Sequence, residues 1–491
     1  MSLSNSSFIL KNDGTLWGCG WNEYNQLGLE DKTNKTTFTI IGINTNDIKS
    51  IYCGQWHTLI LKNDGTLWGC GKNDNGQLGL GKIDGEAIFT RITTNADNIK
   101  SVYCGYDYTF ILKNDGTFWG CGNNSSGQLG LGDTINRTTF TQITTNANNI
   151  NSVECGYRHV LMLKNDGTLW ACGSNGSGQL GLGDTTNRTT FTQIITNTDN
   201  IKSVHCGSNH TFILKNNGTL YGCGYNEHGR LGLGDKTNRN VFTKITTNAN
   251  DIKSVYCGGP YTFALKNDGT LWSCGYNTNG QLGLGDTDYR TIFTQNTINA
   301  NDIKSVYCGY DHTMILKNNG TLWACGYNGE YELGLGDTAN RTTFTQITTN
   351  VNNIKKFANN YNTPSTIKIH DLKIGYTETL DTNNFRNIPV DKFEKLKVLC
   401  VNPDNTYLNC LISFDKKQTW KTFDGTDWTI ISDISPENII LNGMQLKTLD
   451  QLDKNQLIAG GFTGDLDFKI AMKTNNKTVT SSVTKIYIEY K

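Results

Sequence analysis

Imidazole and thiol groups recur along this 491-residue chain in patterns that could bind metal ions. Four histidines stand at multiples of 51 residues from one another, with tyrosines at two intervening positions: His57, His159, His210 and His312, with Tyr108 and Tyr261. Imidazole is a frequent metal ligand. Equivalent residues of successive structural repeats, however, usually lie too far apart to share one ion. We therefore predict that these rings are hydrogen-bonded structural residues, and we expect no metal and no cofactor.

The cysteines follow the same spacing, since 13 of the 15 fall into two series with steps of 51 residues. One series is Cys53, Cys104, Cys155, Cys206, Cys257 and Cys308, and the other is Cys19, Cys70, Cys121, Cys172, Cys223, Cys274 and Cys325. Flanking glycines favour a role as small apolar fillers at crowded strand positions. Disulfides between the two series are the alternative, against which the lack of a recognisable signal peptide argues. No Cys-x-x-Cys pair indicates zinc.

A catalytic set of residues is not found. The sequence contains no nucleophile elbow, no His-Glu-x-x-His and no P-loop. The stretch Gly-Gln-Leu-Gly-Leu-Gly at 76–81 resembles a phosphate loop in its glycine count alone, because no Lys-Ser/Thr pair follows it. Aspartates and glutamates are scattered over turns, where they favour turn geometry. We expect a protein that is not an enzyme.

A repeat positions all of these side chains. A turn pair recurs every 51 residues without any insertion, at Asp13-Gly14, Asp64-Gly65, Asp115-Gly116, Asp166-Gly167, Asn217-Gly218, Asp268-Gly269 and Asn319-Gly320. In the repeat that begins near Ile99 we predict strands at 99–105, 109–113, 117–121 and 140–144, with the turn joining the middle two. Four short strands in about 50 residues are typical of a propeller blade.

Two further repeat positions are predicted to be structural. One aromatic per repeat should fill the space between neighbouring blades. These residues are Trp17, Trp68, Trp119, Trp170, Tyr221, Trp272 and Trp323. In the long loop, Asp133 and Arg137 of the pattern Asp-x-x-Asn-Arg are expected to pair, an exposed contact of small energetic value.

The repeat also resembles a known family. The stretch from His57 to Gly81, HTLILKNDGTLWGCGKNDNGQLGLG, is similar to the repeat of the regulator-of-chromosome-condensation (RCC1) family. The resemblance covers roughly residues 1–360 and implies an all-β, seven-bladed RCC1-like propeller. It implies less about function, because this kind of fold carries many roles.

The ends of the array predict how the ring closes. The first repeat lacks the innermost strand, and residues 354–360 supply a degraded copy of it, with Asn359 where other repeats have cysteine. We expect 354–360 to complete the N-terminal blade, which removes two open sheet edges. The propeller domain then spans 1–363.

Residues 364–491 form a second predicted domain. Strand patterns occur at 395–401, 409–414, 428–431, 467–472 and 485–490, and Thr448 caps one plausible helix. We predict a small β-sandwich-like domain with one helix. The segment Ser413–Gly425 and the closing strands weakly resemble modules of bacteriophage tail and appendage proteins.

Aromatic residues gather on one predicted face of the propeller. Strand order places the loops before the second strand and after the third strand at the same end. Both loops carry rings in some repeats and small or polar residues in others. The candidate partner-binding residues are Trp21, Trp56, Tyr106, Tyr157, Arg158, Tyr225, Tyr276, Tyr310 and Tyr327, and Tyr361 lies in the same register. Loop tyrosines and tryptophans suit protein or sugar recognition, although packing on neighbouring loops is the simpler interpretation.

Composition sets broad limits on partners and location. The formal net charge is zero, which predicts no general attraction to nucleic acid or acidic membranes. No apolar run is long enough to span a bilayer, and the N-terminus lacks the features of a classical signal peptide. We expect no membrane insertion and a cytoplasmic location in the producing cell, or a place in an extracellular or virion-type assembly.

These observations favour a non-enzymatic recognition or scaffold protein that binds a protein or a surface glycan, associated with a phage tail or a toxin. The alternative, implied by the resemblance, is guanine-nucleotide exchange on a small GTPase. That activity depends on an inserted wedge, and the uniform 51-residue repeats leave no room for one.

Overall fold

The computed structural model describes residues 6–42, 47–352 and 354–359, together with the backbone of strands between residues 388 and 490. It contains two compact units, Met1–Thr366 and Ile367–Lys491. Each unit is described by itself. No helix long and apolar enough to cross a bilayer occurs in the described residues.

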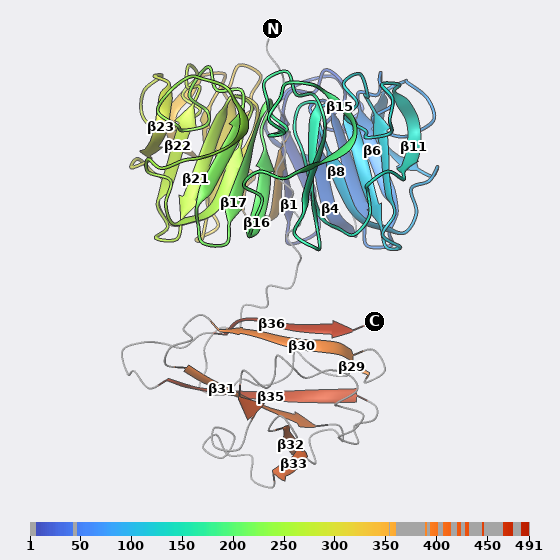
Figure 1. Ribbon diagram of the computed structural model, residues 1–491, viewed down its shortest axis with the longest axis vertical. Coiled ribbons are helices and arrows are strands. Elements are labelled where there is room, and N and C mark those ends of the chain that lie inside the picture. Colours follow the sequence, from blue (N-terminus) through green and yellow to red (C-terminus); the bar gives the residue numbers. More distant parts are fainter. Residues whose placement is uncertain are drawn as a thin grey trace. The chain divides into compact units, whose positions relative to one another are not determined.

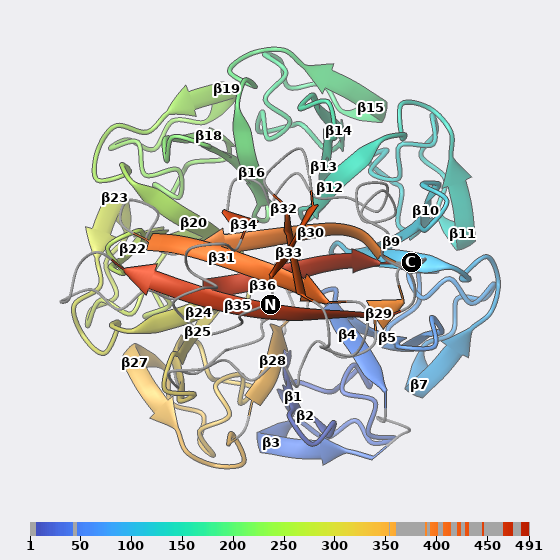
Figure 2. The same ribbon diagram turned by 90° about the horizontal axis from the view of Figure 1, so that it is seen from below.

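The first unit is a ring of seven four-stranded antiparallel sheets, seen end-on in Figure 2. From the axis outward, blade 1 contains β28 (Ile354–Asn359), β1 (Ser6–Lys11), β2 (Leu16–Gly20) and β3 (Lys35–Ile41). Blade 2 contains β4 (Ile48–Cys53), β5 (His57–Lys62), β6 (Leu67–Gly71) and β7 (Glu86–Ile92). Blade 3 contains β8 (Ile99–Cys104), β9 (Tyr108–Lys113), β10 (Phe118–Gly122) and β11 (Arg137–Ile143).

The remaining four blades follow the same order. Blade 4 contains β12 (Ile150–Cys155), β13 (His159–Lys164), β14 (Leu169–Gly173) and β15 (Arg188–Ile194), and blade 5 contains β16 (Ile201–Cys206), β17 (His210–Lys215), β18 (Leu220–Gly224) and β19 (Arg239–Lys244). Blade 6 contains β20 (Ile252–Cys257), β21 (Tyr261–Lys266), β22 (Leu271–Gly275) and β23 (Arg290–Gln295), and blade 7 contains β24 (Ile303–Cys308), β25 (His312–Lys317), β26 (Leu322–Gly326) and β27 (Arg341–Ile347). The predicted all-β, seven-bladed propeller is confirmed.

The core lies between blades rather than within them. The outer-strand phenylalanine Phe140 packs on Gly79 of the preceding blade, where a Cβ atom would lie 2.8 Å from a ring carbon. Gly79 also has a φ of +72°, which other residues adopt at a cost. Cys121 fills the space beside this contact, and its thiol donates to the Gln77 carbonyl at 3.6 Å. The 13 cysteines described are all buried and free, as predicted for structural fillers.

The Asp-Gly turn explains why one aromatic recurs on the third strand. Asp64 Oδ1 accepts from the Thr66 amide at 2.9 Å, and Thr66 Oγ1 accepts from Trp68 Nε1 at 2.9 Å. The Lys62 ammonium lies 4.5 Å from the centroid of the Trp68 ring. This turn therefore orients the indole, which packs on the core between blades 1 and 2.

The first blade combines the two ends of the propeller sequence. Strand β28 pairs with β1 in antiparallel register, with Ala358 opposite Phe8 and Phe357 opposite Ile9. Phe8 and Ile9 are fully buried. The N-terminal strand is therefore held by residues more than 340 positions later in the chain.

The second unit contains β29 (Ile388–Pro389), β30 (Phe393–Cys400), β31 (Thr406–Ser413), β32 (Trp420–Phe423), β33 (Trp428–Ile431), β34 (Met444–Gln445), β35 (Asp465–Thr474) and β36 (Val483–Tyr490) (Figure 1). One sheet has the order β29-β35-β31-β32-β33, with β34 on β31, and β30 pairs with β36. The predicted helix at Thr448 and the candidate residue Tyr361 lie outside the described residues. The sandwich and the resemblance to tail modules stay predictions.

Proline substitutions test the closure of the ring. Successive N–H groups of an edge strand point alternately toward and away from the neighbouring strand. Phe357→Pro and Ala358→Pro should therefore differ, because only one of them removes a β1–β28 hydrogen bond. In thermal unfolding of the full chain, the variant that loses the hydrogen bond should have a lower transition temperature and a broader transition. Melting of both variants at the wild-type temperature would contradict the pairing.

Candidate protein-binding face

The two ends of the propeller differ in character. We call the end with the Asp-Gly turns and the turns that precede each innermost strand the turn face. The opposite end carries the loops before each second strand and the long loops after each third strand, and we call it the aromatic face. Around the axis, its loops are joined by backbone hydrogen bonds, from the Gln55 amide to the Tyr106 carbonyl at 3.0 Å and from Tyr157 to Ser208 at 3.1 Å. Backbone hydrogen bonds thus hold several neighbouring loops of this face together.

The recurrent histidines begin the second strands, next to these loops, and their side chains bridge neighbouring blades. His57 Nε2 lies 3.0 Å from Thr109 Oγ1 of the next blade, and Thr109 Oγ1 donates to the Gln77 carbonyl at 2.8 Å. Since that hydroxyl proton is used, Nε2 carries the imidazole proton and donates. His159 and His210 make the same contact with Thr211 and Thr262. The prediction of hydrogen-bonded structural histidines is confirmed.

Burial keeps these imidazoles neutral. It lowers the pKa of His57 and of His159 to about 3. The ring of His57 also lies against Gly54, where a Cβ atom would collide with it. This explains the glycine that precedes the histidine in the repeat.

An arc of contacting rings crosses the aromatic face from blade 1 to blade 4. Ring centroids are 5.8 Å apart for Trp21 and Tyr24, 5.6 Å for Tyr24 and Trp56, and 4.8 Å for Trp56 and Tyr106. Tyr106 and Tyr157 follow at 3.9 Å. Tyr106 is only 4% exposed, whereas the other four rings are half-buried. Tyr106 therefore supports the arc from below rather than presenting a free surface.

Cations already occupy parts of this arc. The Lys72 ammonium lies 4.4 Å from the centroid of Trp56 and 5.0 Å from that of Tyr24. The Arg158 guanidinium lies 5.4 Å from the centroid of Tyr157. Such contacts are favourable by about 0.5–2 kcal/mol, depending on solvent exposure. The rings of this face thus already contact cationic side chains of the same chain.

The other candidate residues lie on blades 5 to 7. His228, Tyr276 and Tyr289 form a cluster with centroids 5.0 Å apart in each pair. Arg230 lies 4.6 Å from the centroid of Tyr225. Tyr310 and Tyr327 are half-buried, and burial raises the pKa of Tyr310 to about 12. Of the predicted residues on these blades, Tyr276 thus joins a cluster of rings, with His228 and Tyr289, and this cluster is separate from the arc.

Two buried carboxyl groups, of Asp107 and Glu332, and the half-buried carboxyl group of Asp311 accompany the rings. Burial raises the pKa of Asp107 to about 6, although the charges of Lys72 and Arg158 oppose the shift. Burial also raises the pKa of Asp311 to about 7 and that of Glu332 to about 8. Asp311 accepts a hydrogen bond from Gln281 Nε2 at 3.1 Å. In each of the three groups, burial thus favours the neutral acid over the carboxylate.

Several polar atoms of the same face are buried without a hydrogen-bond partner in the described part of the chain. They include Trp56 Nε1, Asp107 Oδ1, Arg158 Nε and Glu332 Oε1. A buried polar atom without a partner costs about 1–3 kcal/mol.

Sequence reasoning missed several members of the face. Tyr24, Lys72, His228 and Tyr289 were not among the candidate residues, nor were the three acids. One signal was available, because the glutamine of Gly-Gln-Leu-Gly is replaced by Arg230 in blade 5 and by Glu332 in blade 7. Comparison of the repeats position by position would have found both substitutions.

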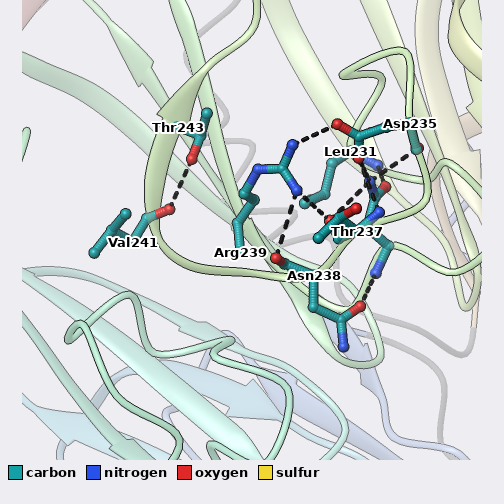
Figure 3. A network of polar contacts seen from close by, with 8 residues as sticks. Leu231, Asp235, Thr237, Asn238, Arg239, Val241 and Thr243 are labelled. Atoms are coloured by element: carbon teal, nitrogen blue, oxygen red, sulfur yellow. Dashed lines mark hydrogen bonds and ion pairs between the residues drawn. The ribbon is translucent and has the colours of Figure 1, made fainter.

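The long outer loops are held by their own contacts. Figure 3 shows Arg239 of blade 5, whose Nη2 donates to Asp235 Oδ2 at 2.5 Å and whose Nη1 donates to the Thr237 carbonyl at 2.6 Å. The predicted pair Arg137–Asp133 has the same geometry at 2.5 Å. These partly exposed pairs shape the loops and add little stability.

Comparison with known proteins agrees with this architecture. A model of the RCC1-like domain matches residues 85–362, and models of the RCC1 repeat match 48–77 and 13–61. The class is thus a propeller of RCC1 repeats. The chain belongs to the RCC1-like family.

Individual relatives differ in how much of their length is matched. The chain is 32% identical to the ultraviolet-B receptor UVR8 of Arabidopsis thaliana over 338 residues, which cover 66% of this chain and 75% of the receptor. It is 31% identical to the human probable E3 ubiquitin-protein ligase HERC4 over 307 residues, covering 60% of this chain and 28% of the ligase. The crystal structure of yeast RCC1 (Prp20) bound to Kap60 superposes with a TM-score of 0.62 at 20% identity, covering 73% of this chain and 89% of that one. This last likeness shows the fold alone.

The buried histidines predict a pH dependence of stability. A histidine whose pKa falls from 6.5 in the unfolded chain to about 3 in the fold stabilises the protein fully above pH 6.5. This contribution is lost progressively as the pH falls from 6.5 toward 3. Blade 6 has Tyr261 at the equivalent position, where its hydroxyl accepts from Thr313 Oγ1. The variant His57→Tyr should therefore lose less stability than the wild type over this pH range.

The measurement is the difference in unfolding free energy between this variant and the wild type at several pH values. The difference cancels the opposite contributions of Asp107 and Asp311. A difference that does not change between pH 6.5 and 4 would contradict the neutral buried imidazole.

Proposed function

We propose that the protein is a non-enzymatic recognition protein that binds a partner protein through the aromatic face. The observation that carries the proposal is the gathering, on one face, of half-buried rings with cationic side chains beside them. The contact residues proposed are Trp21, Trp56, Tyr157, Arg158, Tyr225, Tyr276, Tyr310 and Tyr327, with Tyr106 as their support.

The chemistry of the face favours a partner with basic side chains. Asp107, Asp311 and Glu332 supply carboxyl groups beside aromatic rings. Lysine and arginine bind both kinds of group, through ion pairs and through contacts with ring faces. Lys72 and Arg158 already show this mode of contact within the molecule.

Relatives of similar fold support a protein partner. Yeast RCC1 (Prp20) was crystallised bound to Kap60, and Prp20p is described together with its binding to Gsp1p and histones. These are properties of the yeast protein. They favour a protein over a glycan as the first class of partner to test here, and no feature of the residues described favours an association with a phage tail or with nucleotide exchange.

Substitution of the rings tests the proposed face. Partners are captured from an extract of the producing organism with the full-length chain, and the affinity of the strongest is measured. Trp56→Ala and Tyr276→Ala should each weaken binding by about tenfold or more, as expected for aromatic residues central to an interface. The matched controls are Ile195→Ala and Ile298→Ala, at exposed apolar positions in the turns that precede innermost strands, on the turn face.

If the variants of the aromatic residues and the controls bind with equal affinity, the aromatic face is not the binding surface. Binding to a glycan array that depends on the same rings would replace the protein partner by a sugar. Accelerated nucleotide release from a small GTPase would instead favour the exchange-factor alternative.

The carboxyl group of Asp311 predicts that binding of a basic partner depends on pH. A cation near Asp311 favours the ionised carboxylate, so the affinity should rise as the pH rises through about 7. Asp311→Asn should reduce this rise. Titrations at pH 6 and pH 8.5 measure the effect, and an affinity that falls with pH would contradict it.

A further inference from the structure

A second group of charges lies at the other end of the propeller. The second residue of the innermost strand is lysine in six of the seven blades and asparagine in blade 4. The residues are Lys49, Lys100, Asn151, Lys202, Lys253, Lys304 and Lys355. The first six of these positions are exposed. The chain as a whole has no net charge, so this is a local accumulation of positive charge.

A backbone irregularity presents each of these lysines. In blade 3, Ile99 lies opposite Lys113 and Ser101 lies opposite Leu112, which leaves Lys100 as an extra residue in the strand. The same register shift occurs around Lys49, Lys202, Lys253 and Lys304, and around Lys355 in β28. Such a bulge redirects a side chain away from the regular pleat. The lysines of blades 2, 3, 5, 6 and 7 are therefore taken out of the packed faces of the blades.

The lysines encircle the propeller axis on the turn face. The innermost strands contact one another in a closed order around the axis, from β4 through β8, β12, β16, β20 and β24 to β28 and back to β4 (Figure 2). Lys202 Nζ donates to the Lys253 carbonyl of the next blade at 3.0 Å. A lysine of one blade thus reaches the equivalent position of its neighbour. We call this set the lysine ring.

A second set of lysines on the turn face is already used within the fold. Lys113 pairs with Asp97 and Lys215 with Asp199, each at 2.6 Å, and both ammonium groups lie over rings of the third strand. In contrast, the ion pairs of the described residues include none for Lys100, Lys253 or Lys304. The lysine ring therefore holds more positive charge than the fold itself compensates.

Neighbouring acids offset only part of this charge. Asp251 and Asp302 stand two residues before Lys253 and Lys304 in the preceding turns. Each accepts a hydrogen bond from an asparagine side chain, Asn267 or Asn318, at 2.6 Å. These carboxylates, together with Asp47 before Lys49, offset three of the lysines, whereas asparagine stands at this position before Lys100, Lys202 and Lys355.

We propose that the lysine ring binds a compact anion that carries several phosphate groups. Converging lysines attract multivalent anions because each ammonium adds to the same local potential. A small molecule with phosphates distributed around a ring can meet several lysines at once, whereas extended nucleic acid is bound by a basic stripe or patch that tracks its backbone. The site lies at the opposite end of the strands from the aromatic face, so its test and that of the proposed function fail independently.

Calorimetric titration of the full-length chain with inositol hexakisphosphate tests the site. We expect saturable binding that weakens strongly between 50 and 300 mM salt, because the charges lie close to solvent. The triple variant Lys100→Gln, Lys253→Gln and Lys304→Gln should lose about tenfold or more in affinity for the probe. The charge-matched control replaces Lys32, Lys236 and Lys244 by glutamine, at exposed positions away from the ring.

A gain-of-function variant completes the design. Asn151→Lys fills the one position of the ring without a lysine, and it should bind the probe severalfold more tightly. The thermal transition of each variant shows that the fold is retained. The proposal is overturned if the ring variant and the control bind alike, if Asn151→Lys gives no gain, or if duplex DNA of equal charge concentration binds more tightly than the probe.

Discussion

Every blade must bury both of its faces against two neighbours, and one contact makes this possible. A phenylalanine of the outer strand packs on a glycine of the preceding blade, as Phe140 does on Gly79, and Phe38 of blade 1 packs in the same way on Gly334 of blade 7. Each glycine has a positive φ and no side chain, so two sheets approach closely at that point. Because the contact recurs all round the molecule, no blade has a free face, and the array is stable only as a ring.

The same constraint leaves the region around the axis less restricted. Phenylalanine, leucine and cysteine at the blade interfaces repeat with few changes, since each must fit a fixed space. The loops at the axis need only keep their backbone hydrogen bonds. They carry rings in some blades, glycine or serine in others, and buried acids in blades 3 and 7. Binding surfaces on rigid scaffolds usually arise where packing demands least.

Much of the propeller could be predicted because spacing in the sequence maps directly onto position in the fold. The strands, the Asp-Gly turn, the free cysteines and the bridging histidines all follow from reading one repeat. The burial of Tyr106, the stacking of Tyr24 on Trp56 and the acids at Asp107 and Asp311 could not be predicted, since each depends on how side chains of different blades meet. The lysine ring was hidden for another reason, because the bulge interrupts the alternation by which strand residues are assigned to faces. Residues 364–491 carry no repeat, so nothing comparable constrains a prediction there.

The joining of β1 to β28 has a consequence for how the protein is made. During synthesis the N-terminal strand emerges first, yet its inner partner, Ile354–Asn359, is translated only after all the other blades. Until then one edge of β1 is unpaired, beside the apolar residues Phe8 and Ile9 that are fully buried in the closed ring. The strands of six complete sheets are thus synthesised before the ring can close, and the chain can mispair at this edge during most of its translation.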